Sequence, residues 1–542
     1  MKYVVVFRIP GIKKYVFNTD RLAEIRGAST LLSQLNLEEA RIFLEDKLRG
    51  ETLRCVYVGG GIGQFIIAAP ADKIDRGLKE LAALFARETR GDIRLLYGKS
   101  PLDEDEGNYH HALKSAMYDM DFQNDRQAVE SRTPVHTGLV RECMSCSGMA
   151  AELLTHHGET RILCPVCAQK TGYDTRTAKQ DLWEELDRYL KREGVTTKRP
   201  ADFESIGDKC KAKKGYTALV YADGNGVGKI IDQIKTPDQF EFFSETVDQS
   251  IREACYEALY EVYFDSSGTR GTYEEMPAVV LMLGGDDLMV YLTADKAFPF
   301  AIKAAEKFNE KTIRRFQEYT AAQPFPVEHI AEKGLTISLG IAYGKTHTPF
   351  AIMMDQAEEL LDNAKRSGSK DLKPGELFAP AYIDYHLSTT FNTINVRDCR
   401  KNHLETFTNV AKERFTKDRI RLYSKPYSLP EAKELYKNAQ AVVKSGIPNT
   451  RLKRLGYAPL LALDNGSLFK SALECKTLYT RAKRDQRQAV QQALDAFDCF
   501  STMPWKKEPG IYSTVLVDLM ELADFCLLHD PVNQGVNHES SY

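Results

Sequence analysis

Short apolar, β-prone runs alternate with longer segments of helical character along the first two thirds of the chain. These two patterns are typical of buried strands and amphipathic helices, respectively. For residues 1 to about 130 they predict strands at 3–9, 54–58, 64–68 and 93–97, and helices at 19–35, 38–48 and 71–89. Two of these strands form a hairpin. This order predicts a split β-α-β sandwich of the ferredoxin-like type.

The same order of elements returns in the second third of the chain. Strands are predicted at 218–222 and 335–343, a hairpin at 279–291, and helices at 238–263, 294–319 and 350–365. A fixed order that occurs twice is the signature of an internal repeat. Between the copies, a helix is predicted at about 180–192 and a lysine-rich linker at 209–214. The sequence therefore predicts two related α+β domains.

The last third is mostly helix-like and contains no motif with a recognisable chemistry. Helices are predicted at 410–421, 429–444, 471–497 and 512–528, with a frayed polar tail after Pro531. We interpret this part as a helical bundle. The predicted domains are thus 1–132, 133–212, 213–380 and 381–542.

Composition narrows the class of protein. A chain of 542 residues is too long for one core, and a net charge of −3 argues against a generally basic nucleic-acid coat. Basic clusters at 209–214 and 451–454 are ordinary for solvated surfaces. No run of 18 apolar residues is present, and the first apolar segment is too short for a signal peptide. We therefore expect a cytoplasmic protein that does not contact a membrane.

Four of the eleven cysteines form two CxxC pairs separated by seventeen residues, Cys143 with Cys146 and Cys164 with Cys167. Four thiolates at this spacing can surround one zinc ion tetrahedrally. A redox role is less favoured, because neither pair lies in a thioredoxin-like strand-helix context. His156 and His157 lie nearby and could substitute as ligands, but four cysteines already complete a structural site. The sequence predicts structural Zn²⁺.

The hairpin at 279–291 carries Gly284, Gly285, Asp286 and Asp287 at its tip. Two carboxylates about 4 Å apart repel by roughly 1 kcal/mol in water and about 4 kcal/mol when partly buried, so a divalent cation is their natural partner. A solvated aspartate turn is the alternative, since ordinary hairpins also use Gly and Asp. Asp223, which ends the strand expected beside this hairpin, would add a third carboxylate. Three such groups suit Mg²⁺, or Mn²⁺, together with substrate phosphates.

Glycines surround both hairpin tips. Gly224, Gly226 and Gly228 follow Asp223 and would let backbone N–H groups approach phosphates. In the first domain, Gly59, Gly60 and Gly61 align with the second tip but lack both acids. This cluster lies between two strands, so it does not fit a dinucleotide-binding or P-loop motif. The repeat therefore has one copy with the acids and one without.

The ordered segments DGNGVGK, LGGDDLMVY, SLGIAYG and AEELLDNAK are specific in combination. They resemble the nucleotidyl-cyclase palm of the large subunit of type III CRISPR effector complexes and, more distantly, the GGDEF diguanylate cyclases. The opening GIKKYVFNTDRLAEIRGASTLL looks like that family's first palm, and the cysteines occupy the place of its zinc motif. The resemblance covers residues 1 to about 370. It implies an α+β fold of two ferredoxin-like palm domains, an intervening zinc ribbon and a C-terminal helical bundle.

The resemblance further implies that ATP is converted to cyclic oligoadenylate when the guide-loaded complex captures foreign RNA. Partners would be ATP, other complex subunits, guide RNA and target RNA. Asp223, Asp286 and Asp287 would bind the catalytic metals. Nucleotide contacts would come from Gly224, Asn225, Gly226, Gly228, Gly284, Gly285, Ser338, Lys365, Gly59, Gly60 and Gly61. Without any ligand, Lys365 would be an ordinary cation near a helix C-terminus.

Two departures from the family pattern matter. Many relatives begin with a histidine-aspartate nuclease domain, whereas here the palm begins at residue 1, so we expect no DNase activity from this chain. Asn225 stands where relatives commonly have an aspartate, and an amide is a weaker metal ligand. Three rival functions remain: a silent scaffold, a diguanylate-type cyclase and a templated polymerase. The clustered acids argue against the first, the acid-free copy against the second, and the lack of a long basic, aromatic-interleaved channel against the third.

Overall fold

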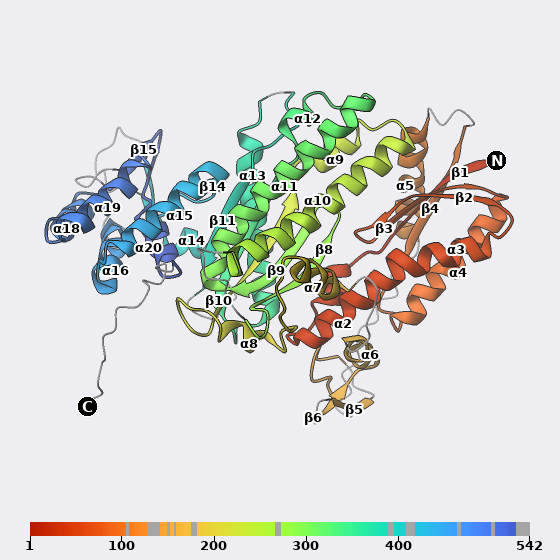
Figure 1. Cartoon of the computed structure of the whole chain (residues 1–542), viewed down its shortest axis with the longest axis horizontal. Coiled ribbons are helices and arrows are strands. Elements are labelled where there is room, and N and C mark those ends of the chain that lie inside the picture. Colours follow the sequence, from red (N-terminus) through yellow and green to blue (C-terminus); the bar gives the residue numbers. More distant parts are fainter. Residues whose placement is uncertain are drawn as a thin grey trace.

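The computed structural model describes residues 1–103, 108–126, 141–148, 152–156, 159–174, 181–265, 273–373, 375–388, 395–407, 418–462, 468–499 and 504–526. The molecule is elongated (Figure 1). The first α+β domain lies at one end, the second occupies the middle, and helices of the last third lie at the other end. We call the two α+β domains palm 1 and palm 2.

Palm 1 is a four-stranded antiparallel sheet in the order β2-β3-β1-β4. Successive side chains of a β-strand point to opposite faces of the sheet, so in β1 Val4 and Val6 pack in one apolar core while Val5 and Phe7 pack in another. The last strand begins three residues later than the sequence predicts. The elements are β1 (Lys2–Arg8), α1 (Ile12–Val16), α2 (Leu22–Ser33), a π-helical turn (Gln34–Glu39), α3 (Ala40–Lys47), β2 (Thr52–Gly59), β3 (Ile62–Ala68), α4 (Ala71–Glu88), β4 (Leu96–Leu102) and α5 (Tyr109–Arg126).

Palm 2 repeats this topology, because its strands β10-β7-β9-β8 have the same relative order as β4-β1-β3-β2. A glycine in the last strand of each palm admits a helix backbone closely: a Cβ on Gly98 would lie 2.3 Å from the Ala116 carbonyl, and one on Gly340 would lie 2.3 Å from the Ala357 carbonyl. The predicted internal repeat is confirmed. The elements are β7 (Tyr216–Gly224), α9 (Val227–Ile231), α10 (Pro237–Tyr263), β8 (Ala278–Gly284), β9 (Asp287–Thr293), α11 (Ala294–Ala322), α12 (Ile330–Lys333), β10 (Ile337–Lys345) and α13 (Phe350–Lys370).

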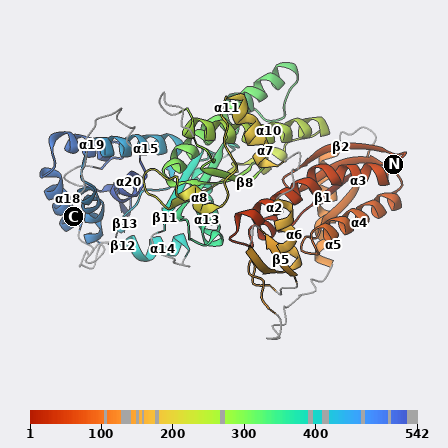
Figure 2. The same ribbon diagram turned by 60° about the horizontal axis from the view of Figure 1, so that its bottom comes forward.

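A small module lies between the palms in sequence; its first part, with the four cysteines, lies against palm 1, and its last two helices pack on palm 2. It contains β5 (Glu152–His156), β6 (Glu159–Leu163), α6 (Pro165–Asp174), α7 (Leu182–Arg192) and α8 (Phe203–Gly207). Figure 2 shows α6 beside α2, and the contact is close because a Cβ on Gly27 would lie 1.8 Å from the Lys170 carbonyl oxygen. Buried Glu24 of α2 accepts hydrogen bonds from Arg161 and Ser145. The part of the module that carries the cysteines is therefore docked firmly on palm 1, whereas α7 and α8 contact the strands of palm 2.

The last third contains more strand than the sequence predicts. β11 (Tyr382–Leu387) pairs parallel to β10, and β14 (Tyr427–Ser428) pairs with β11, so the palm 2 sheet continues past residue 380. A second sheet has the order β12-β13-β16-β15. Its strands are β12 (Glu405–Phe407), β13 (Arg419–Arg421), β15 (Lys506–Glu508) and β16 (Ile511–Ser513).

The helices of this part only partly match the prediction. The helix expected at 410–421 is wrong at its end, where residues 419–421 form a strand, and its remainder falls outside the described residues. The stretch 471–497 is two helices, because Lys483 has an extended backbone and caps the second. The tail after Pro531 also lies outside the described residues. The helices are α14 (Val396–His403), α15 (Leu429–Lys444), α16 (Asn449–Tyr457), a 3₁₀ turn (Ala458–Leu460), α18 (Leu468–Thr480), α19 (Arg484–Asp495) and α20 (Leu516–Ala523).

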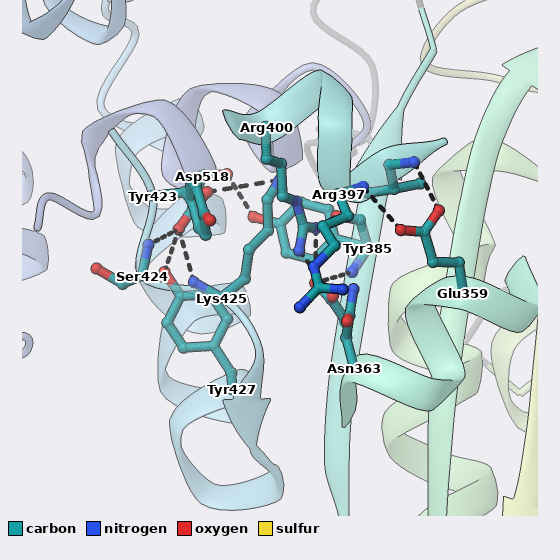
Figure 3. A network of polar contacts seen from close by, with 12 residues as sticks. Glu359, Asn363, Tyr385, Arg397, Arg400, Tyr423, Ser424, Lys425, Tyr427 and Asp518 are labelled. Carbon is teal, nitrogen blue, oxygen red and sulfur yellow. Dashed lines mark hydrogen bonds and ion pairs between the residues drawn. The ribbon is translucent and has the colours of Figure 1, made fainter. Parts of the chain in front are cut away.

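A buried polar network joins this last part to palm 2 (Figure 3). Fully buried Asp518 of α20 accepts hydrogen bonds from the Tyr427 hydroxyl at 2.6 Å and the Ser424 N–H at 2.7 Å. Arg400 donates two hydrogen bonds to Asp384 on β11, each 2.8 Å long. Since buried charges are tolerated only when paired and hydrogen-bonded, this network fixes the C-terminal helices against the palm 2 sheet.

Candidate active site

Three aspartates meet at one end of the palm 2 sheet. Asp223 is the penultimate residue of β7, Asp287 begins β9, and Asp286 lies in the turn between β8 and β9. Ala222 pairs with Leu288, which sets Asp223 and Asp287 on adjacent strands one residue beyond that pair. Asp286 lies over the chain at Gly224, where a Cβ would come within 2.7 Å of its Oδ2 atom. The sheet register thus brings together the three acids that the sequence singled out.

Burial and mutual repulsion dominate the electrostatics of this cluster. Burial, then the charges of Asp223 and Asp287, raise the pKa of Asp286 from 3.8 to about 7. Burial and Asp223 raise the pKa of Asp287 to about 6, against the opposing effect of Lys13. A carboxyl group whose charged form is this unfavourable is well suited to bind a cation that restores the charge balance.

Neighbouring side chains already hold two of the three acids. Lys365 of α13 forms an ion pair with the Asp223 Oδ2 atom at 2.5 Å, and the Tyr221 hydroxyl donates to the Asp287 Oδ1 atom at 3.1 Å. Lys365, predicted from the motif AEELLDNAK, therefore lies at the acidic cluster. Its ammonium occupies a place where a metal ion or a metal-bound phosphate would compete for Asp223.

Asn225 and Ser338 lie behind the cluster and hydrogen-bond within the protein. The Ser338 hydroxyl donates to the Asn225 Oδ1 atom at 2.9 Å, and the Asn225 amide donates to the Thr336 hydroxyl at 2.9 Å. Ser338 is fully buried and Asn225 is 6% exposed. Asn225 thus fastens the end of β7 to β10 and has its oxygen occupied. A nucleotide contact for either side chain would require these bonds to break, and we leave both out of the proposed nucleotide site.

The glycines that follow Asp223 have unequal surroundings. Gly226 adopts a positive φ of 72°, and a Cβ there would lie 2.8 Å from the Leu377 carbonyl oxygen. Space beside Gly228 is open, since no atom lies within 4 Å of a Cβ built there. The helix that follows, α9, is only five residues long. Gly226 is therefore required by the backbone, whereas Gly228 leaves room for another molecule.

The hairpin tips of the two palms face each other. A Cβ on Gly284 would lie 3.7 Å from the Gly60 nitrogen, and one on Gly60 would lie 3.9 Å from the Gly284 carbonyl oxygen. Their pairing is equivalent, because Gly59 pairs with Ile62 as Gly284 pairs with Asp287. The alignment of the two tips made from the sequence thus holds in space.

A cavity of about 170 Å³ opens between these tips and palm 1. Gly59, Gly60, Gly61, Gly284 and Asp287 line one part, and Ser29, Ser33 and Asn36 of palm 1 add polar groups. Most of the remaining wall is apolar: Ile9, Ile12, Val16, Phe17, Leu32, Leu37, Leu182, Leu281, Met282 and Leu283. An apolar cavity with few polar groups and an acidic edge has the composition of a small-molecule site.

Several residues that support the acidic turn were not predicted from the sequence. Asp248 of α10 accepts a hydrogen bond from the Gly285 N–H at 3.1 Å, and Arg252 donates to the Leu283 carbonyl at 3.2 Å. Glu185 of α7 accepts from Arg252 at 2.8 Å. Asp248 and Arg252 stand four residues apart on a predicted helix, a spacing that signals an ion pair. Nothing in that spacing shows that the pair supports a turn more than thirty residues away.

The four cysteines predicted to bind a metal lie together. Among the described residues, Cys143, Cys146, Cys164 and Cys167 form the one group of three or more Cys, His, Asp or Glu side chains with ligand atoms all within 4.8 Å of one another. They are therefore positioned to bind a metal ion. The three aspartates are more loosely spaced, which agrees with the ion pair that draws Asp223 to Lys365. His157 falls outside the described residues, as does the side chain of His156.

No helix in the described part of the chain is both long and apolar enough to cross a membrane.

Comparisons with known proteins agree with this architecture. Residues 216–372 match the family model of the Cas10/Cmr2 second palm domain. Csm1 of T. onnurineus has a similar fold, with a TM-score of 0.57 and 14% identity over 97% of this chain and 69% of that one. Two Csm1–Csm4 cassettes align at 15% identity over the same shares, one in complex with pppApApA (TM-score 0.56) and one with cA4 (TM-score 0.53). No curated protein shows a significant match.

These findings support a Cas10-like palm-domain protein. Residues 216–372, which make up most of palm 2, match the second palm domain of Cas10/Cmr2, and the chain as a whole is similar in fold to Csm1. The chain spans 53% of the length of the chain that it matches in two further Csm1–Csm4 structures.

Proposed function

We propose that this chain is a Mg²⁺-dependent nucleotidyltransferase that joins ATP molecules into an oligoadenylate, cyclic in its final form. The observation that carries the proposal is the meeting of Asp223, Asp286 and Asp287 at one end of the palm 2 sheet, where Asp287 also lines the inter-palm cavity. The cA4, cA3 and pppApApA bound to structures of similar fold support adenylates as the product class.

The donor set fits Mg²⁺. It consists of hard carboxylate oxygens, and burial together with mutual repulsion raises the pKa of Asp286 and Asp287, so a bound cation would favour their charged forms. Asp223, Asp286 and Asp287 would hold the ions, which when bound would supply Lewis-acid stabilisation of the charge on the phosphates.

The side chains of this chain would then position the reactants. The cavity would hold the acceptor nucleotide, with its base against the apolar wall and its 3′-hydroxyl toward Asp287. The 3′-hydroxyl oxygen would lose its proton to water and form a bond to the α-phosphorus of a second ATP, the bond between that phosphorus and the oxygen bridging to the β-phosphate would break, and pyrophosphate would leave. Lys365 would neutralise the triphosphate once released from Asp223, and the Tyr221 hydroxyl would keep Asp287 oriented. Gly284 and Gly285 would allow close approach of the nucleotide, as would open Gly228, whereas Gly224 makes room for the Asp286 side chain.

The cysteine cluster and the similarity to Csm1–Csm4 structures suggest how the protein is assembled. The four cysteines would hold structural Zn²⁺, whose preferred ligands are thiolates. We propose domain divisions at 132, 212 and 380, with β11 and β14 of the last part adding two strands to the palm 2 sheet. The similarity to Csm1–Csm4 structures supports partnership with other subunits of a type III CRISPR complex, in which guide and target RNA would switch the enzyme on. A cytoplasmic location follows from these partners.

The test uses the full chain in its complex, with cognate target RNA, ATP and Mg²⁺. Mass spectrometry of the products should show 3′–5′ linked adenylates and pyrophosphate. The variant Asp286→Ala with Asp287→Ala should bind the complex normally and form no product. Wild-type protein that makes no adenylate would refute the proposal and leave a scaffold role, while a guanylate product from GTP alone would favour the cyclase alternative.

A further inference from the structure

Lys13 of palm 1 lies against the acidic cluster of palm 2. Its ammonium donates to the Glu358 Oε1 atom at 2.8 Å and lies 4.7 Å from the centre of the Tyr221 ring. Tyr221 is the residue whose hydroxyl donates to Asp287. Lys13 also lines the inter-palm cavity together with Asp287, and its positive charge lowers the pKa of that acid. A cation from one palm is thus placed beside the acids of the other.

The short helix that carries Lys13 is held in place from two sides. The buried ammonium of Lys170, on α6 of the cysteine-containing module, donates to the Tyr15 carbonyl oxygen. The Phe17 ring packs against the ring of Phe350, the first residue of α13, at a centroid distance of 5.3 Å. The start of α1 is set by Gly11, whose φ is 71°. Lys13 is therefore presented to the cavity by a fixed backbone, and only its side chain has to move.

The present partner of Lys13 is easily exchanged. The side chains of Lys13 and Glu358 are 36% and 45% exposed, and exposed ion pairs contribute only about 0–1 kcal/mol. Among the described residues, one other cation lines the cavity, Arg252, and its guanidinium already pairs with Glu185, Asp248 and the Leu283 carbonyl. Lys13 is thus the cation of the cavity wall that is available to a ligand.

We propose that Lys13 breaks its ion pair with Glu358 and binds a phosphate group of the nucleotide in the inter-palm cavity. This inference rests on the proposed function, because it names a ligand of the same site. A nucleotide brings several negative charges next to Asp287 and Glu358, and a compact ammonium is a suitable counter-charge for a phosphate. Lys365 lies by Asp223, so each palm supplies one lysine to the phosphates.

The test compares Lys13→Ala with Lys14→Ala in the full-length, zinc-loaded chain. Lys14 is the adjacent, exposed lysine of the same helix and serves as a matched control. Calorimetry with a non-hydrolysable ATP analogue and Mg²⁺ should show about 10- to 100-fold weaker binding for Lys13→Ala, the range expected for one lost charged hydrogen bond. Adenosine should bind both variants and the wild type equally. Lys13→Arg should recover most of the affinity for the analogue.

Each outcome decides one claim. Equal analogue affinity of Lys13→Ala and Lys14→Ala overturns the inference. Equal losses for adenosine and the analogue also overturn it, because they indicate a structural role for Lys13. Failure of the wild-type complex to form adenylates refutes the proposed function instead, and that experiment is separate from the binding measurement.

Discussion

Replacing Asp286 by asparagine should stabilise the protein while abolishing its activity. The pKa of Asp286 in the folded chain is about 7, against an ordinary value of 3.8. The folded state therefore binds a proton that the unfolded state has lost, and stability falls as the pH rises between these values. At 1.4 kcal/mol for each pKa unit, the aspartate lowers the free energy of unfolding by roughly 4 kcal/mol at pH 8 and by about 1.6 kcal/mol at pH 5, compared with a side chain that does not ionise. Asparagine keeps the shape and removes this charge.

The gain in stability of Asp286→Asn should accordingly grow by roughly 2–3 kcal/mol from pH 5 to pH 8. For a domain of about 150 residues, that growth corresponds to about 5–10 °C in the midpoint of thermal unfolding. Calorimetry in magnesium-free buffer, without a chelator that could remove a metal ion from the four cysteines, measures this growth. Asp362→Asn, which removes an exposed charge from α13, is the control. A gain that is absent or does not change between pH 5 and pH 8 would show that burial and repulsion of the acids are not the cause.

Three further predictions follow from the same site. Asp248→Ala removes the acceptor of the Gly285 N–H and should lower kcat for adenylate synthesis about tenfold. Steady-state kinetics that determine kcat and KM separately would detect this change. Apparent Mg²⁺ affinity should rise from pH 6 to pH 8 and level off above the pKa of Asp286, because protons compete with the metal below it; calorimetric titration at several pH values measures this. Cys164→Ser should reduce bound zinc from one ion per chain and lower the first unfolding midpoint, as metal analysis and calorimetry would show.

The paired sandwiches could be predicted from the sequence because local signals and topology agree there. Apolar runs bounded by glycines fix the hairpins, and the repeated order of elements fixes the sheet. Asp223 could be placed beside Asp286 because the first strand of this topology neighbours the central hairpin. The four cysteines were predictable from spacing alone.

Other features depend on contacts between segments far apart in the chain. Lys13 reaches Glu358 across 345 residues, and no local pattern distinguishes it from Lys14. The hydrogen bonds that occupy the side chains of Asn225 and Ser338 depend on Thr336 and on the register of β10. In the last third, strands of three residues such as β13 carry too few side chains for a periodic signal, which is why a helix was predicted there.

The two facing hairpins differ in a way that bears on the history of the repeat. In palm 1, Gly60 and Gly61 both have positive φ, 56° and 79°, whereas in palm 2 only Gly285 does, at 61°. These φ values correspond to type I′ and type II′ turns, respectively. An aspartate at Gly61 would bring its Cβ to 2.3 Å from the Ile12 Cδ1 atom, and with its positive φ it would leave the chain in a different direction from Asp286. Placing acids on the palm 1 tip by point substitution would therefore also require Ile12 and the turn to move. The two tips share a register but are not interchangeable frameworks for an acidic turn.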